Sequence, residues 1–332
     1  MNKHNKYINS KNKIHVTIKH IESVRIMDVN ELKKIQNEVI TKSRKIDIIS
    51  ISLWVLLNGI LYIAKYKGAF YVIDTILIFS VGSFTKIKAV SQQVKIFNSE
   101  FKNVFVLSAL SKIFTNLKYE PDKGLSRDII LNTKMLQMGD TYSSNDYFEA
   151  EYKNVKVKHA DIDIERKIEV TSSDQSTSTY YFTVFKGKWM VFDFNKKFNS
   201  NIQVSQKGFK NSKISNVGEV NRYKKIKVED SEFNKMFKIY AQNENDAFCV
   251  LTPTLIEKIK KLTKNIEGKI LLCFIDNELH VGLSNKKDSF ENSVYKKIDE
   301  NKINNEISKD IKVITNFIDE LILDNTVFKG EM

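Results

Sequence analysis

Two long apolar runs near the start of the chain dominate its pattern of hydrophobic and polar positions. Residues 48–64 carry no charged side chain, and residues 68–85 carry only Asp74. A helix rises about 1.5 Å per residue, so each run spans roughly 26 Å, which is close to the roughly 30 Å hydrocarbon core of a bilayer. The pattern predicts a transmembrane helical hairpin within residues 46–86, with spans at 48–64 and 68–85.

Polar residues inside the runs support the alternative of a helical hairpin buried in a large soluble core. Ser50, Ser52 and Asn58 interrupt the first run, and Asp74 interrupts the second. An aspartate at the middle of a span costs about 2.5–3.5 kcal/mol, but Asp74 follows Gly68 closely and lies nearer an interface, where this cost is smaller. An ionisable residue inside a span is a functional candidate, so Asp74 is one here. The structural alternative is a hydrogen bond between the two helices.

The charges that flank the two runs predict their orientation. The fifteen residues before Ile48 and the fifteen after Thr85 hold eight lysines and arginines, whereas the connecting loop holds only Lys65 and Lys67. Basic residues collect on the cytoplasmic side of a membrane. No signal peptide is recognisable in the polar first forty residues. We therefore expect a multi-pass protein of the cell (inner) membrane, with both termini and most polar residues in the cytoplasm.

Residues 1–45 predict a basic N-terminal arm followed by a juxtamembrane helix. Apolar and polar residues alternate at positions 14–18, which favours a short strand. Asp28 followed by Glu31 has the pattern of a capping box, so we expect a helix to run from about Val29 into the membrane.

Nearly half of the net charge of +13 lies in this arm and the residues that follow it up to 47. Residues 1–47 carry eleven basic and five acidic side chains. Anionic lipid head groups of the bilayer are the simplest partner for such a segment beside a membrane. Binding of nucleic acid through the arm is a further alternative, disfavoured because no recognised binding motif accompanies the charge.

Apolar residues recur at near-heptad intervals in residues 87–120. The second membrane helix is therefore expected to continue as a membrane-proximal helix to about Leu117, and Pro121 and Gly124 would end it. Its apolar face needs a cover, which the soluble domain or a second copy of the chain could supply. A homo-oligomer is thus one of the options.

Residues 121–332 predict a cytosolic α+β domain in which helices pack on an antiparallel sheet. Period-two patterns between residues 147 and 195 favour a meander, with an exposed hairpin loop at 171–179 and a turn at 186–188. Residues 199–225 are polar and irregular, so a long excursion from the sheet is expected.

The remaining elements are predicted from caps and turn residues. They are a helix at 231–236 capped by Ser231, a strand at 237–240, a helix at 253–264 capped by Thr252, a hairpin of 269–275 with 278–283 about Asp276-Asn277, and a helix at 303–323.

Four motifs, in order, resemble those of one family of bacterial membrane proteins. They are Lys118–Gly124, Val184–Phe198, Asp230–Tyr240 with Val250–Pro253, and Phe274–Leu279 with Asp288–Glu291. The chain resembles the family called "domain of unknown function 3137", also labelled galanin, over about residues 45–325. The resemblance implies two membrane helices before a cytosolic domain, and it brings no catalytic residues, since none is established for the family. The sequence departs from the family pattern at 199–225 and at Phe248-Cys249.

A row of acids on one predicted strand is the first candidate for chemistry. Asp161, Asp163 and Glu165 share one strand face, with His159 beside them. Alternate carboxylates could bind a divalent cation. We favour a solvated strand face, with the isoleucines between the acids pointing inward.

The two cysteines are the second candidate. Cys249 and Cys273 with His280 could form a nucleophile pair or part of a zinc site, but no C-x-x-C spacing supports zinc. Both cysteines lie in apolar stretches that look like strands. We favour a role in the core, in a reducing compartment.

Asp193, between Phe192 and Phe194, is the third candidate. A carboxylate among aromatic rings can have a shifted pKa, which is sometimes a catalytic sign. Strand alternation instead places Asp193 on the face opposite the two rings, paired with a lysine. Asp193 and Asp74 are therefore the two speculative functional residues.

No phosphate-binding glycine loop, nucleophile elbow or H-E-x-x-H motif is present. We expect no catalytic, cofactor-binding or metal-binding residues. The favoured hypothesis is a membrane-anchored, non-catalytic module that binds an unknown protein partner or lipid head groups. The alternative is an enzyme at the membrane face with a cleft in the α+β domain, lined by residues such as Asp193 or His159.

Overall fold

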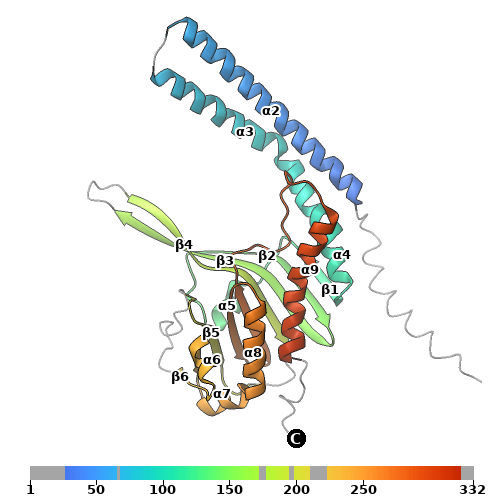
Figure 1. The fold of residues 1–332 in the computed structure, drawn as a ribbon, viewed down its shortest axis with the longest axis vertical. Helices are drawn as coiled ribbons and strands as arrows, with labels where there is room; N and C mark the ends of the chain where they lie inside the picture. Colours follow the sequence, from blue (N-terminus) through green and yellow to red (C-terminus); the bar gives the residue numbers. More distant parts are fainter. Residues whose placement is uncertain (1–26, 66–67, 172–176, 194–197, 210–222, 323–332) are drawn as a thin grey trace, which may run out of the picture. The chain divides into compact units, whose positions relative to one another are not determined.

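A computed structural model of the chain describes residues 27–65, 68–171, 177–193, 198–209 and 223–322. The predicted strand at positions 14–18 lies outside the described residues. The chain forms two compact units, which are described separately (Figure 1). The helical unit consists of residues 1–108 and 291–303, and the sheet unit consists of residues 109–290 and 304–332. Segment 291–303 thus leaves the sheet unit, joins the helical unit and returns.

Two long helices form most of the helical unit. Helix α2 spans Val29–Ile63, and helix α3 spans Ala69–Phe101. The Asp28 carboxylate accepts a hydrogen bond from the Glu31 backbone N–H at 2.8 Å, and the Glu31 side chain reaches back to the Asp28 N–H. This capping box confirms the predicted start of the helix.

Helix α3 continues into a short π-helix, η1 (Lys102–Leu107), and then into α4 (Ser108–Ser111). The predicted continuation past the apolar run is confirmed as far as Ser111, but its predicted end at about Leu117 is wrong, because strand β1 begins at Thr115.

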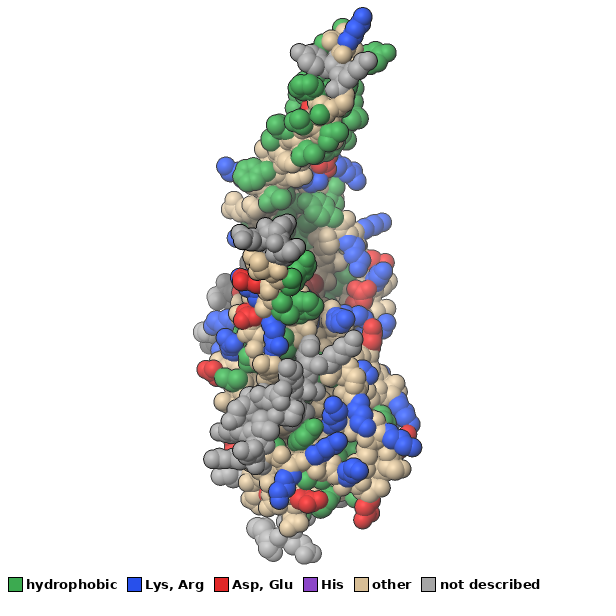
Figure 2. Space-filling view, turned by 90° about the vertical axis from the view of Figure 1, so that its left-hand side faces the viewer, with side chains coloured by type: hydrophobic (Ala, Val, Ile, Leu, Met, Phe, Trp, Pro, Cys, Tyr) green, Lys and Arg blue, Asp and Glu red, His purple; other side chains and the backbone are tan. Residues whose placement is uncertain are grey.

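The apolar stretches of α2 and α3 face outward. Each contains an 18-residue window of high hydropathy of which only 6% is buried. Among the most exposed large apolar side chains are Ile63 at 80% and Phe84 at 69%. Figure 2 shows hydrophobic side chains gathered on the surface of this pair of helices. Both helices are therefore long and apolar enough to cross a membrane.

Small and charged residues hold α2 against α3. A Cβ atom added at Gly82 would lie only 2.4 Å from the Ser50 hydroxyl oxygen, so the two backbones approach closely at this point. The Lys86 ammonium forms an ion pair with the Asp47 carboxylate at 2.8 Å. The hairpin is thus a packed pair of helices.

Segment 291–303 binds to the first half of α2. The Gln36 amide donates hydrogen bonds to the backbone carbonyls of Val294 and Lys296, each at 2.8 Å. The hydroxyls of Ser43 and Tyr295 lie 3.2 Å apart. These bonds explain why a polar residue such as Gln36 is buried in the helical unit.

One antiparallel sheet organises the sheet unit. The described residues form nine strands in the spatial order β1-β2-β3-β4-β9-β8-β5-β7-β6, and every neighbouring pair is antiparallel. The strands are β1 (Thr115–Glu120), β2 (Thr141–Tyr152), β3 (Val155–Thr171), β4 (Thr177–Asp193), β5 (Ile202–Gln206), β6 (Lys224–Ile226), β7 (Phe237–Ala241), β8 (Lys269–Ile275) and β9 (Glu278–Ser284).

Short helices lie between and beside these strands. They are α5 (Arg127–Asn132), α6 (Ser231–Met236), α7 (Glu244–Val250), α8 (Pro253–Asn265) and α9 (Glu300–Phe317), followed by the π-helical η4 (Ile318–Ile322). Thr252 caps α8 as predicted, but Asp230 caps α6 instead of Ser231. An antiparallel sheet with packed helices confirms the predicted α+β class.

Both faces of the centre of the sheet are covered. On one face, Ile162, Ile164 and Trp189 join a core cluster with residues around α5. On the other face, Phe192 of β4 lies near Phe317 of α9, with ring centroids 6.4 Å apart. Because the middle strands are buried on both sides, polar residues on them must find partners inside the protein.

Two parts of the predicted sheet are wrong. No turn occurs at 186–188, since β4 runs through it, and Gly187 has φ +146 with no room for a Cβ beside the Leu283 carbonyl oxygen of β9. The excursion predicted at 199–225 contains β5, which lies between β8 and β7 and carries the buried Ile202 and Val204; residues 210–222 of it lie outside the described residues. The hairpin at 171–179 is confirmed by β3 ending at Thr171 and β4 beginning at Thr177.

Candidate functional site

Asp74 takes part in a hydrogen-bond network between α2 and α3. One of its carboxylate oxygens accepts from the Asn58 amide at 2.8 Å, and the other accepts from the Thr75 backbone N–H at 2.8 Å. The Trp54 indole N–H donates to the Thr75 hydroxyl at 2.8 Å. This geometry agrees with the structural alternative for Asp74, a hydrogen bond that joins the two helices.

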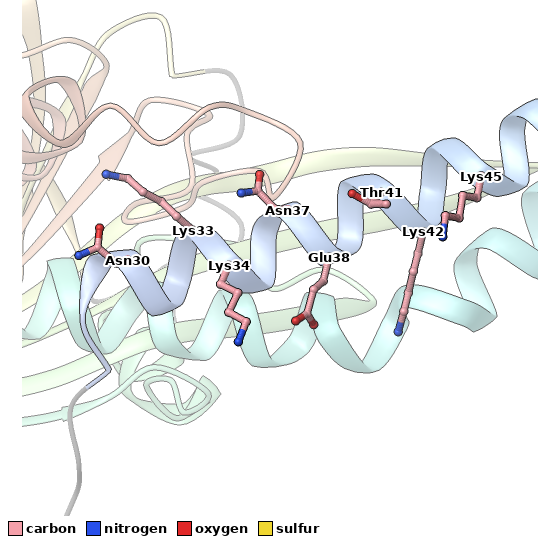
Figure 3. A pocket seen from close by; sticks show the side chains of 8 residues that line it. All are labelled: Asn30, Lys33, Lys34, Asn37, Glu38, Thr41, Lys42 and Lys45. Atoms are coloured by element: carbon pink, nitrogen blue, oxygen red, sulfur yellow. The ribbon is translucent and has the colours of Figure 1, made fainter.

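The first half of α2 carries a basic face. Figure 3 shows Lys34, Glu38 and Lys42 pointing to the same side of the helix. The eight residues of this face line a shallow hollow of about 570 Å³, and they are Asn30, Lys33, Lys34, Asn37, Glu38, Thr41, Lys42 and Lys45. Lysines outnumber acids on this face, so it attracts anions.

A second polar cluster is buried within the sheet unit. Asp161 of β3 and Lys188 of β4 lie opposite each other in the strand register and are 3% and 1% exposed. The Lys188 ammonium donates a hydrogen bond to the Ser289 hydroxyl and forms an ion pair with Asp310 of α9 at 3.0 Å. The Ser289 hydroxyl donates to Asp161 at 2.7 Å, and its backbone N–H donates to the same carboxylate. Hydrogen bonds thus connect Lys188 through Ser289 to Asp161.

A bulge in β2 adds a further acid to this cluster. The pairing of β2 with β3 shifts between Asn145 and Phe148, and Asp146 adopts φ +54 there. The buried Asp146 carboxylate accepts a hydrogen bond from the Tyr119 hydroxyl at 2.6 Å. Asp146 is thereby fixed beside the strand face that carries Asp161.

Three carboxylates of the cluster have the spacing that a cation site requires. One oxygen each from Asp146, Asp161 and Asp288 lies within 4.8 Å of the others. The Lys188 ammonium already supplies one positive charge there. Burial raises the pKa of the Asp161 carboxyl well above its usual range, and the charge of Lys188 opposes this shift. A proton on Asp161 can thus remove one negative charge from the cluster without a metal ion. The expectation that the chain has no metal-binding residues stays a prediction.

His159 is buried next to the cluster. Its ring stacks on Phe148 with centroids 4.9 Å apart, and its Nδ1 lies 3.4 Å from the Asp146 backbone oxygen. Burial, followed by the positive charge of Lys188, lowers the pKa of His159 to about 3. The imidazole is therefore neutral at neutral pH and packs as an aromatic ring.

The solvated strand face predicted for the acids of β3 is wrong at Asp161, which is buried. Asp163 forms an ion pair with Lys186 at 2.5 Å, and Ile162 and Ile164 point into the core as expected. Lys188 was missed because a Lys-Gly-Lys sequence is typical of a turn, and no local signal indicates a buried lysine.

Asp193 lies at the end of β4 and accepts a hydrogen bond from the Asn277 amide at 2.9 Å. The predicted lysine partner is not found among the described residues. Asp276, with φ +51, occupies the β8–β9 turn as expected. Asp193 therefore interacts with a hairpin turn.

The cysteines do not come together as a reactive pair. Cys273 lies opposite His280 in the β8–β9 register, and burial raises the pKa of its thiol. The His280 ring contacts Trp189 and Glu278 instead, at 3.5 and 3.1 Å. Cys249 is exposed on α7, so the prediction that it lies in a buried strand is wrong.

A groove of about 510 Å³ lies on another part of the sheet unit. Leu251 and Ile256 are buried in its floor, and Glu229 and Glu257 are exposed at its rim. Neither this groove nor the hollow on α2 is lined by Asp193 or His159.

Comparison with known proteins agrees with the resemblance inferred from the motifs. The family model described as "Protein of unknown function (DUF3137)" matches residues 183–323. The resemblance to this family is confirmed over that range. Three of the four motifs lie within or overlap the match, whereas Lys118–Gly124 precedes it.

The first, second and fourth motifs meet at the buried cluster. Tyr119 comes from the first motif, Lys188 from the second, and Ser289 from the fourth. The cluster is thus where these separated motifs are brought together in space.

Other comparisons add little. The crystal structure of the mycobacterial trehalose monomycolate transport factor A, TtfA, matches 68% of this chain and 93% of its own chain, with 11% sequence identity and a TM-score of 0.37. That score does not establish a shared fold. No curated protein matches the sequence.

Proposed function

We propose that this chain is a membrane-anchored binding protein without catalytic activity, multi-pass in the cell membrane, with both termini in the cytoplasm. The outward-facing apolar surface of α2 and α3 carries the proposal. An exposed apolar surface that extends along two long helices marks a site that binds a membrane or another protein. Two adjacent helices whose backbone bonds are internally satisfied are suited to lipid, since a bilayer offers no water to unpaired groups.

The polar pairs of the hairpin agree with this environment. Asn58 and Asp74 bind each other where α2 meets α3, so neither side chain has to point into hydrocarbon. Asp47 and Lys86 pair at the other end of the apolar runs. Polar residues thus lie at helix contacts or at the ends of the spans.

Anionic lipid head groups are the ligand that the basic face of α2 supports. Lys34, Lys42 and Lys45 lie within a few turns of the apolar run that begins at Ile48. Each basic residue near an anionic membrane surface contributes about 1 kcal/mol of attraction. Lys33 is less available to lipid head groups, since its ammonium forms an ion pair with Glu300 at 2.8 Å.

The sheet unit supports a binding or scaffolding role more than catalysis. Within the cluster, the two side chains with shifted pKa values, Asp161 and His159, are buried, and the Lys188 ammonium is hydrogen-bonded to Ser289. A catalytic group has to reach a substrate, directly or through one water. Asp161, His159 and Lys188 line neither hollow described above.

Thiol labelling of the full chain in cells tests the anchoring and the topology. Cys249 is exposed and serves as a natural cytoplasmic probe. A membrane-impermeant maleimide should label Cys249 only after permeabilisation. A Lys65→Cys variant with Cys249→Ser should be labelled in intact cells, because Lys65 lies in the external loop. Recovery of the protein in the supernatant after lysis without detergent would refute the anchoring.

Lipid retention by the detergent-solubilised full chain tests the head-group proposal. Replacing Lys34, Lys42 and Lys45 by glutamine should weaken binding of phosphatidylglycerol by roughly tenfold or more and leave phosphatidylcholine binding unchanged. A matched control replaces three lysines of the sheet unit, Lys118, Lys261 and Lys287, all about 60% exposed. Equal losses in the two variants would contradict a role for α2.

A further inference from the structure

Strands β3 and β4 extend beyond the rest of the sheet as a two-stranded ribbon (Figure 1). Pairing of β3 with β2 ends at Glu165, and pairing of β4 with β9 ends at Gly187. Pairing between β3 and β4 continues to Thr171 and Thr177. We define the ribbon as residues 165–171 and 177–183, in which no third strand lies beside either edge among the described residues.

One face of the ribbon is apolar and exposed. Ile168 lies opposite Tyr180, and their neighbours on the same face are Val170 and Phe182. These side chains are exposed by 40% for Ile168, 48% for Val170, 52% for Tyr180 and 54% for Phe182. An alternating strand normally turns such a face toward a core. Here the core of the sheet unit does not reach it.

The opposite face of the ribbon is polar. Lys167 lies opposite Tyr181, and Glu169 lies opposite Thr179. Lys167 and Glu169 form an ion pair at 2.5 Å. The ribbon is therefore amphipathic, with one face suited to water and one suited to a partner.

A two-stranded ribbon is marginally stable without a third strand or a covered face. At the base of the ribbon the Lys167 N–H donates to the Asp140 carboxylate, and beyond it no third described strand pairs with the outer edges, which disfavours insertion into hydrocarbon, where backbone groups find no partner. A protein surface can cover the apolar face without placing the strand edges in hydrocarbon.

We propose that a second copy of this chain covers the ribbon, with the two apolar faces packed against each other. The face consists of an aliphatic row on β3, Ile168 and Val170, beside an aromatic row on β4, Tyr180 and Phe182. A two-fold axis along the ribbon lays Tyr180 of each copy over Ile168 of the other and Phe182 over Arg166, the residues opposite them in the register, so ring meets aliphatic side chain and ring meets cation. Aligned sheets pack in this way about 10 Å apart.

The charge on the ribbon argues against a partner of strong opposite charge. The only charged side chain on the apolar face of the described ribbon is Arg166, which lies at its base opposite Phe182. A face without a charge pattern does not select a partner of complementary charge. Its shape, large rings beside small branched side chains, then decides what fits.

Chemical cross-linking of the full chain, in native membranes and in detergent, tests the interface. Tyr180 and Tyr181 are adjacent and similarly exposed, at 52% and 56%, but lie on opposite faces. In a Cys249→Ser background, Tyr180→Cys should give a dimer with a bis-maleimide that reaches about 10 Å, the spacing of packed sheets. Tyr181→Cys is the matched control and should react several-fold more slowly.

A second variant separates the interface from misfolding. The pair Ile168→Ser with Phe182→Ser should convert the dimer to a monomer in sedimentation experiments. Cys273 should remain unreactive toward maleimide, because it is buried while the sheet unit is folded. Equal cross-linking at Tyr180→Cys and Tyr181→Cys, a monomeric wild type, a dimer that survives the double substitution, or cross-links only to other proteins would each overturn the proposal.

Discussion

The two units of this chain place their apolar and polar side chains in opposite ways. In the helical unit, large apolar residues such as Ile63 and Phe84 face outward, and Asn58 binds Asp74 where the helices meet. In the sheet unit, apolar residues form the core, and a charged residue, Lys188, is sealed among partners. In both units, these polar groups are paired with a neighbouring side chain. The difference fits the surroundings proposed above, lipid for the hairpin and water for the sheet unit.

Substitution of Lys188 should cause the largest loss of stability, because this residue is a charged side chain buried in the sheet unit. Lys188→Met keeps most of the side-chain volume but leaves the carboxylates of Asp161 and Asp310 without their cation. Loss of one partner from a buried ion pair typically costs about 3–5 kcal/mol. Reactivity of the buried Cys273 thiol along a denaturant titration, in a Cys249→Ser background, measures the free energy of unfolding of the sheet unit.

The matched control tests whether the loss comes from charge. The double variant Lys188→Met with Asp161→Asn should recover part of the stability, because the uncompensated carboxylate is then removed. If the double variant were as unstable as the sum of the two single variants, the two side chains would not be coupled.

The local elements of both units could be predicted from the sequence, whereas the cluster could not. Asp28 and Thr252 cap their helices through bonds to residues three positions away, so their signals are contiguous. Lys188 and Ser289 are 101 positions apart, and Asp161 and Ser289 are 128 apart. Periodicity assigns strands, but it does not show that both faces of β3 are covered. Asp161 was therefore expected in water and Lys188 in a turn.

The acid sensitivity of the sheet unit should depend on His159. Burial lowers its pKa to about 3 in the folded chain, against about 6.5 when unfolded. Below pH 6.5 the unfolded chain binds the proton more readily, so this stability is fully present at neutral pH and is lost as the pH falls toward 3. The loss between pH 7 and pH 4 should be about 3 kcal/mol. Unfolding titrations at several pH values should show that His159→Phe, which keeps an aromatic ring, flattens this dependence.

Asp161 should affect the pH dependence of the unfolding free energy in the opposite direction from His159. Its raised pKa means that the folded chain holds the proton more strongly than the unfolded chain, so its contribution is lost as the pH rises from about 4 through the raised value. Asp161→Asn should thus make the unfolding free energy fall more steeply on acidification. A curve for His159→Phe that is parallel to that of the wild type would show that the imidazole does not titrate as described.

The close contact of α2 and α3 at Gly82 should be sensitive to the side-chain volume at this position. Gly82→Leu places a side chain where Ser50 already lies, and such overpacking costs about 1–3 kcal/mol. Gly59→Leu is the matched control, because a Cβ there has no neighbour within 4 Å. Emission of Trp54 in a Trp189→Phe background reports on the hairpin alone, during unfolding of the full chain in detergent. Similar losses in both variants would mean that the close approach does not hold the helices together.

The smallest loss of stability should come from removing the hydrogen bond between Asn58 and Asp74 in the hairpin. Asn58→Leu leaves the Asp74 carboxylate without the amide donor, which should lower the stability measured from Trp54 emission by about 0.6–1.7 kcal/mol, as for other hydrogen bonds between membrane helices. Asp74→Asn should cost less, because an amide oxygen still accepts the bond from Asn58 and no charge remains to be solvated. A polar pair in a water-facing helix would contribute less than this, because water competes for the same hydrogen bond. A loss within this range is therefore the observation expected of a pair surrounded by lipid or detergent, whereas a loss near zero would place the pair in water.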